Sequence, residues 1–180
     1  MEGVSGQAGG RYTRSINGMV GAMVVVFVVV VAFVMFRDAV RSDVDTSVRE
    51  VDYVQPAAFA QEQAGFEILA PPELPEGWRS TSVRYTPGLD ERWHLGLLTE
   101  EDRYVGVEQA RSTEENLVET HVDEEARRGE PVRVAGVRWQ TWTDEGGDLA
   151  LVRRGEDVTT LVVGHEVPLE RLVEFTASLR

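Results

Sequence analysis

The side chains of this sequence that are able to act as catalysts or metal ligands are three histidines, several acidic clusters and a few serines. No two of the histidines, His94, His121 and His165, lie one helical turn apart, and no Glu-x-x-His motif occurs. Glu125 follows His121 by one turn, but one such pair does not complete a zinc site. We therefore expect packed or boundary histidines and predict neither a metal site nor a cofactor.

The acidic clusters and the serines lie in no recognisable catalytic motif. Residues 144–148 (DEGGD) have the composition of a calcium loop but lack the ligand spacing of an EF-hand, so we expect a hairpin turn there. The sequence also has no Gly-x-Ser-x-Gly elbow, no Ser-x-x-Lys motif and no glycine-rich phosphate loop; the serines considered are Ser80, Ser82, Ser112 and Ser178. Two carboxylates that meet only in space, as in a glycosidase, remain an open alternative.

Tryptophan and arginine give the clearest indication of a contact surface. In a strand through Thr143, period-two alternation places Trp139 on one face and both Arg138 and Trp142 on the other. An exposed tryptophan beside an arginine is typical of a binding hot spot. We therefore predict Trp142 and Arg138, together with Tyr104, as binding residues; the alternative is that a helix or loop covers Trp142.

An uncharged stretch near the N-terminus, residues 18–36, fixes the class of protein that we expect. As a helix it would reach roughly 28 Å, close to the ~30 Å hydrocarbon core of a bilayer. A cleaved signal peptide fits less well, because the apolar run is too long and no small-x-small site follows closely. The predicted organisation is a polar tail (1–17), a transmembrane helix (18–36), a stalk (37–65) and an extracytoplasmic domain (66–180). The basic residues do not set the orientation; we expect the N-terminus to be cytoplasmic.

The charge balance excludes one class of partner. The 180-residue chain carries a net charge of −13, contains no cysteine, and has arginine as its only strongly basic residue type. An acidic domain repels phosphate backbones, so we expect no nucleic acid. The same field favours a basic partner or a cation, and the absence of cysteine excludes disulfides and thiol chemistry.

The hydrophobic pattern predicts an α+β domain with a largely antiparallel sheet of about six strands and two packed helices on one face. Its order is three strands, helix, three strands, helix. The strands are expected at 79–86, 92–99, 103–110, 133–143, 147–154 and 157–164, and the helices begin after Ser112, with a Ser112–Glu115 capping box, and at Pro168. A short helix from Pro56 to Gly65 and a short strand at 66–69 are expected before them. The stretches HLGLLTEEDRYVGVEQ and LALVRRGEDVTTLVVGHE echo one another and are compatible with duplication.

Three stretches together, RYTRSINGMVGAMVVV, LPEGWRSTSVRYTPG and WHLGLLTEEDRYVGVEQ, resemble a known family. The chain is similar, from about Arg11 to its C-terminus, to the actinobacterial single-pass membrane proteins of the domain of unknown function 4245 family. The resemblance implies a bacterial, membrane-anchored protein of a high-GC organism. It implies no activity and no catalytic residues.

From these observations we expect a non-enzymatic, membrane-anchored extracytoplasmic module that binds a protein or ligand at the membrane surface. Its lipid contact would be the bilayer around residues 18–36. One alternative is an envelope hydrolase that uses a pair of carboxylates. A second is a structural subunit of a membrane complex, because Gly18, Gly21 and Ala22 allow another helix to approach closely.

Overall fold

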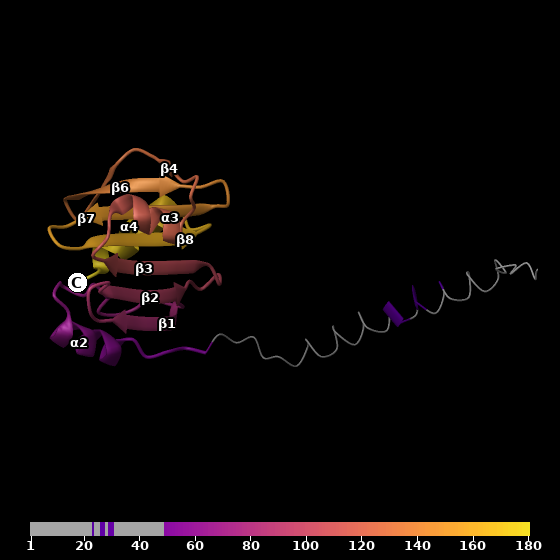
Figure 1. Ribbon diagram of the computed structural model, residues 1–180, viewed down its shortest axis with the longest axis horizontal. Helices are drawn as coiled ribbons and strands as arrows, with labels where there is room; N and C mark the ends of the chain where they lie inside the picture. Colours follow the sequence, from indigo (N-terminus) through magenta and orange to yellow (C-terminus); the bar gives the residue numbers. More distant parts are fainter. Residues whose placement is uncertain (1–22, 24–25, 28, 31–48) are drawn as a thin grey trace, which may run out of the picture. The chain divides into compact units, whose positions relative to one another are not determined.

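The computed structural model describes residues 49–180, together with Met23, Val26, Phe27, Val29 and Val30, which are helical and exposed (Figure 1). The chain divides into two units, Met1–Ser47 and Val48–Arg180. The predicted tail, most of the predicted span and part of the stalk therefore lie outside the described residues. Among the residues that are described, no helix is both long enough and apolar enough to cross a membrane.

The second unit is an α+β domain built on one antiparallel sheet, as predicted. Its elements are α2 (Val54–Gln63), β1 (Arg79–Thr86), β2 (Arg92–Leu98), β3 (Tyr104–Ala110), α3 (Glu114–His121), β4 (Arg127–Arg128), β5 (Val132–Val134), β6 (Val137–Thr143), β7 (Asp148–Arg154), β8 (Thr159–His165) and α4 (Leu169–Ser178). The strands lie in the order β1-β2-β3-β8-β7-β6-β4, with β5 paired to β6, and Figure 1 shows this order from bottom to top. Two meanders therefore meet at the central β3–β8 pair.

The sheet is buried on both faces at its centre. Register pairs Val107 with Val162, and both belong to the larger core, which also holds Leu172 and Phe175 of α4. The neighbouring β8 residues Leu161 and Val163 point to the other face and pack with α3 in a second core. Six of the seven β8 residues are buried. A strand covered on both faces reads as a nearly continuous apolar run, and TTLVVG in β8 has this character.

The prediction of about six strands was wrong, because the residues that the structure describes form eight. The six expected strands are present, but the one expected at 133–143 is a hairpin of β5 and β6, and β4 adds a short pair at the edge. Ala135 and Gly136, the two residues between β5 and β6, have φ of 47° and 84°. Positive φ at both central residues is the geometry of a tight hairpin turn, which Ala-Gly signals less clearly than Asn-Gly.

The two helices expected on one face lie on opposite faces, α4 over the larger core and α3 over the smaller one. The short helix expected from Pro56 to Gly65 is confirmed as α2 (Val54–Gln63), which lies at the β1 edge (Figure 1). The strand order is consistent with the sequence echo, since β2–β3 and β7–β8 are equivalent hairpins. If a two-fold axis perpendicular to the sheet related the two halves, α3 and α4 would lie on the same face. They lie on opposite faces, so the helices do not follow this symmetry.

Residues 66–69 do not form the expected strand, because side chains satisfy their backbone groups. The Gln61 Oε1 accepts from the N–H of Ile68 at 2.8 Å, and the buried Gln109 accepts from Leu69 N at 2.7 Å. Gln109 also donates to the carbonyl of Glu67 at 3.0 Å. With these hydrogen bonds in place, no ladder partner is needed.

The helix cap also differs by one residue from the prediction. Thr113, not Ser112, caps α3, and its Oγ1 accepts from Asn116 N at 3.2 Å. The carbonyl of Ser112 is instead bound by Thr159 of β8 at 2.6 Å, which ties Ser112 to the sheet and moves the cap to the next hydroxyl.

Candidate functional site

A groove of about 1090 Å³ runs between residues 73–78 and α4. Pro75 lies within the segment 73–78, and the Trp78 N–H donates to the Pro75 carbonyl at 3.0 Å. Gly77 has a φ of 78°, a conformation that favours glycine, and it closes this turn. A local hydrogen bond and a glycine therefore close the turn in this wall of the groove.

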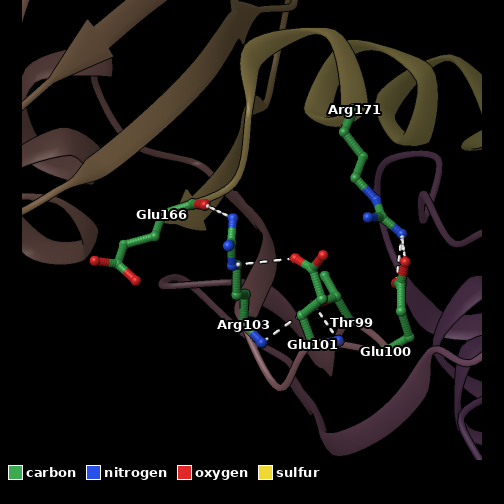
Figure 2. A network of polar contacts seen from close by, with 6 residues as sticks. All are labelled: Thr99, Glu100, Glu101, Arg103, Glu166 and Arg171. Carbon is green, nitrogen blue, oxygen red and sulfur yellow. Dashed lines mark hydrogen bonds and ion pairs between the residues drawn. The ribbon is translucent and has the colours of Figure 1, made fainter.

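The turn between β2 and β3 forms the end of the groove. The hydroxyl of Thr99 accepts from the backbone N–H of Arg103 at 3.1 Å and of Glu101 at 3.3 Å. The Arg103 guanidinium reaches the carbonyl of Glu166 at 2.5 Å and the Glu101 carboxylate at 3.2 Å (Figure 2). This network ties the turn to the segment just before α4, so that Glu100 is held facing the helix.

Arg171 of α4 joins the two walls. Its guanidinium forms an ion pair with Glu100, and Figure 2 shows the two side chains pointing toward one another. The Arg171 guanidinium also lies 5.6 Å from the centre of the Trp78 ring, within cation–π range. The hydrogen bond from Arg171 lowers the pKa of the Glu100 carboxyl, so Glu100 stays ionised at neutral pH.

Trp78 is held in the groove wall by ring contacts. Its ring stacks on Phe175 of α4, with ring centres 5.0 Å apart and an interplanar angle of 26°. Its buried Nε1 has no hydrogen-bond partner among the residues that the structure describes. The aromatic and cation–π contacts therefore fix the position of the ring in the wall.

The groove has an apolar floor and an acidic rim. The apolar lining consists of Leu74, Pro75, Trp78, Pro168 and Phe175, and the acidic lining consists of Glu73, Glu76, Glu100, Glu170 and Glu174. Arg171 is the one basic residue in the lining. Of the glutamates, Glu100 alone forms an ion pair with another described residue. The groove therefore presents four exposed negative charges around an apolar centre.

The predicted binding residues lie elsewhere and apart from one another. Trp142 and Arg138 are on β6, on the same face, as expected. The Trp142 side chain is half-buried against the smaller core, and its Nε1 donates to Glu114 of α3 at 2.7 Å. Arg128 stacks on the same ring at 5.9 Å. Trp142 thus lies under α3, which was the alternative interpretation, while Arg138 is exposed.

Tyr104 lies three strands away from β6, at the start of β3. It lines a second cavity, of about 490 Å³, on the face of the sheet that α3 covers in part. His94, His121 and Glu108 line the same cavity. The structure therefore brings Tyr104 together with two histidines and an acid, and not with Trp142 or Arg138.

The sequence analysis did not predict the groove residues, because no local sequence pattern indicates them. Glu100 and Arg171 are 71 positions apart, and only the fold makes them neighbours. One weak signal was present in the sequence. Glu170 and Glu174 lie one helical turn apart beside the apolar stripe of α4, so the sequence indicates an acidic face on this helix but not its place in a groove.

A comparison with curated proteins finds no match to the chain. Within the described residues, no three His, Cys, Asp or Glu side chains are arranged to hold a metal ion. The family model described as "Protein of unknown function (DUF4245)" matches residues 11–179, which is nearly the whole sequence, so the chain belongs to the DUF4245 family.

Proposed function

We propose that this protein is a membrane-anchored, extracytoplasmic binding module whose groove holds a basic segment of a partner protein. The observation that carries the proposal is the combination of an apolar floor and a rim of unpaired glutamates in one groove. Protein interfaces share this anatomy, with an apolar centre inside a polar rim. Complementary charge steers the partner and fixes its register.

Arg171 illustrates the chemistry that the partner would use. This arginine already lies between an aromatic ring and a carboxylate of the groove. A guanidinium is suited to this environment, because it pairs with carboxylates and stacks on aromatic rings. An arginine or lysine of the partner would meet Glu170 and Glu174, which are exposed on α4.

The membrane anchor is the second part of the proposal and is supported by the uncharged residues 18–36. Tethering raises the effective concentration of a weak interaction, so a small interface is sufficient. We further propose that the protein is an actinobacterial single-pass protein. The resemblance of its N-terminal stretch and its exclusive use of arginine as the strongly basic residue support this origin.

Topology can be tested cleanly, because the chain has no cysteine. We expect Leu89→Cys, at a 98% exposed position in the β1–β2 turn, to react in intact cells with a membrane-impermeant maleimide. A Ser5→Cys variant should react only after the membrane is permeabilised. Labelling of Leu89→Cys that also required permeabilisation would contradict the proposed orientation.

The groove is tested with a defined probe, a short fluorescein-labelled peptide of alternating arginine and leucine. We expect fluorescence anisotropy to show that it binds the full-length protein in detergent, and that added salt weakens the complex. The double substitution Glu170→Gln/Glu174→Gln should reduce affinity about fivefold, since each exposed ion pair contributes about 0.5 kcal/mol.

The matched control is Glu124→Gln/Glu125→Gln, which removes the same charge beside α3 on the other face of the sheet. This variant should bind the arginine–leucine peptide as the unmodified protein does. A glutamate–leucine peptide should not bind. Equal losses in both double variants would show non-specific attraction to an acidic surface, and the groove would not be the site.

A further inference from the structure

Three neighbouring strands place a serine, a histidine and a glutamate in one hydrogen-bonded chain, away from the groove. The Ser82 Oγ of β1 lies 2.8 Å from His94 Nε2 of β2, and His94 Nδ1 lies 2.6 Å from Glu108 Oε1 of β3. Glu108 is buried, with 6% exposure, while His94 and Ser82 are half-buried. The order and the contact atoms are those of a nucleophile, its base and the acid that orients the base.

The hydrogen bonds define the tautomer that this arrangement requires. The Glu108 carboxylate can only accept a hydrogen bond, so His94 Nδ1 must carry a proton and donate the hydrogen bond to Glu108. Nε2 of the neutral imidazole is then the free acceptor, and the Ser82 hydroxyl donates to it. His121 Nδ1 approaches the same Glu108 oxygen at 3.9 Å from α3, beside the relay.

Two glycines leave room for the relay on the sheet surface. A Cβ at Gly96, which pairs with Ser82 in the register, would collide with the Ser82 Oγ and lie 3.4 Å from His94 Nε2. A Cβ at Gly106 would lie 2.7 Å from the Tyr104 hydroxyl. Glycine inside a strand often marks a close approach of other groups, and here it keeps the serine at its histidine.

The cavity beside the relay holds two arginines, whose charge is balanced by Asp90 and by the relay's own glutamate. Arg84, the register partner of His94, and Arg92, two residues before His94, line the cavity with His94 itself. Tyr104 also lines the cavity, and burial raises its pKa to about 12, so its hydroxyl remains a neutral donor at physiological pH. These donors suit an anionic group and a developing oxyanion.

We propose that Ser82, His94 and Glu108 form a hydrolytic site for esters that carry a carboxylate or phosphate, with Arg84 and Arg92 binding the anionic group. The site is separate from the groove, and it uses a serine where the sequence suggested a pair of carboxylates. No local motif marks it, because its three residues come from three strands.

In the acylation step the Ser82 Oγ forms a bond to the ester carbonyl carbon, and its proton passes to His94 Nε2. The carbon–oxygen bond to the leaving alcohol then breaks, and His94 returns that proton to the alkoxide. Water next attacks the acyl-serine and gives a proton to His94. The bond to the Ser82 Oγ breaks, Oγ recovers the proton, and a carboxylic acid is released. Glu108 stabilises the imidazolium in both steps.

The test uses full-length protein in detergent and a biotinylated fluorophosphonate, whose phosphorus takes the place of the carbonyl carbon and loses fluoride. Peptide mass spectrometry should find Ser82 modified. Ser82→Ala should abolish the modification, and His94→Gln should slow it roughly hundredfold, the usual contribution of a general base. Ser112→Ala, at a partly buried serine outside the relay, should leave the rate unchanged.

Separate measurements report on the folding of each variant and on the substrate specificity of the site. Each variant is checked by thermal unfolding, and Gly96→Ala should suppress labelling although Ser82 is still present. The ester mono-p-nitrophenyl succinate should be hydrolysed faster than p-nitrophenyl butyrate, and Arg84→Gln/Arg92→Gln should remove that preference. A folded protein whose Ser82 is not modified, or whose modification is unaffected by His94→Gln, would overturn the proposal, whatever the groove binds.

Discussion

Trp93→Ala is expected to lower the free energy of unfolding by about 3–5 kcal/mol, the usual cost of removing a fully buried tryptophan. Trp93 has no exposed surface and lies in β2, at the centre of the larger core. Its Nε1 also donates to the Leu69 carbonyl at 3.1 Å. The substitution therefore opens a cavity and frees the segment that leads into the groove wall.

This loss is measured by urea titration of the full-length protein in detergent, with unfolding followed by circular dichroism. Trp93→Phe is the informative control, because it keeps an aromatic ring but removes the hydrogen bond to Leu69. We expect it to cost less than the alanine variant. A loss below about 1 kcal/mol for Trp93→Ala would show that the site collapses around the missing ring and that the segment 66–78 is held by its other contacts.

The strands were predictable because their alternation is a local property. Trp93, Leu95 and Leu97 on one face of β2 are enough to indicate a half-buried strand, and β1 begins and ends at the predicted residues. The turns at Gly146-Gly147 and Gly155 were predictable for the same reason, since their residues favour turns whatever lies around them.

The faces of the helices were not predictable, because local sequence does not say which side of a sheet a helix crosses. The apolar stripes of α3 and α4 are alike in type, yet Leu117 packs in one core and Leu172 in the other. The failure at 66–69 has a similar origin. Side-chain hydrogen bonds satisfy that backbone, and the one to Leu69 comes from a glutamine 40 residues away.

The candidate sites were the least predictable part, because each is assembled from segments that are far apart in the sequence. The sequence placed His94 on the strand face opposite Trp93, where a packed histidine was the expected outcome. Its hydrogen bonds to Ser82 and Glu108 depend on the register of β1, β2 and β3, which no single segment contains. Tyr104 was predicted as a contact residue, but its surroundings are this polar cluster.

Glu91→Gln is expected to cost about 2–3 kcal/mol at pH 7, because it leaves buried donors without a charged acceptor. Glu91 is buried just before β2. Its carboxylate accepts from Gly65 N at 2.9 Å, from the Tyr85 hydroxyl at 2.8 Å and from Arg111 Nε at 3.1 Å. These hydrogen bonds connect the end of α2 to the β1–β2 hairpin, so their loss should destabilise this edge of the domain.

The cost should depend on pH with a definite sign. The Gly65 N–H, together with Tyr85 and Arg111, lowers the pKa of the Glu91 carboxyl in the folded protein. A lowered folded pKa contributes stability above the unfolded value of about 4.3, and that contribution disappears as the pH falls through the folded pKa. The difference in unfolding free energy between the unmodified protein and Glu91→Gln should therefore be large at pH 7 and shrink in acid.

Urea titrations at neutral and at acidic pH measure this difference directly. Glu62→Gln, which neutralises an exposed carboxylate on α2, should change stability little at either pH. A penalty for Glu91→Gln that stayed constant in acid would mean that shape, not charge, makes Glu91 necessary. A penalty that fades with protonation would show that the charge of this one buried carboxylate links α2 to the sheet.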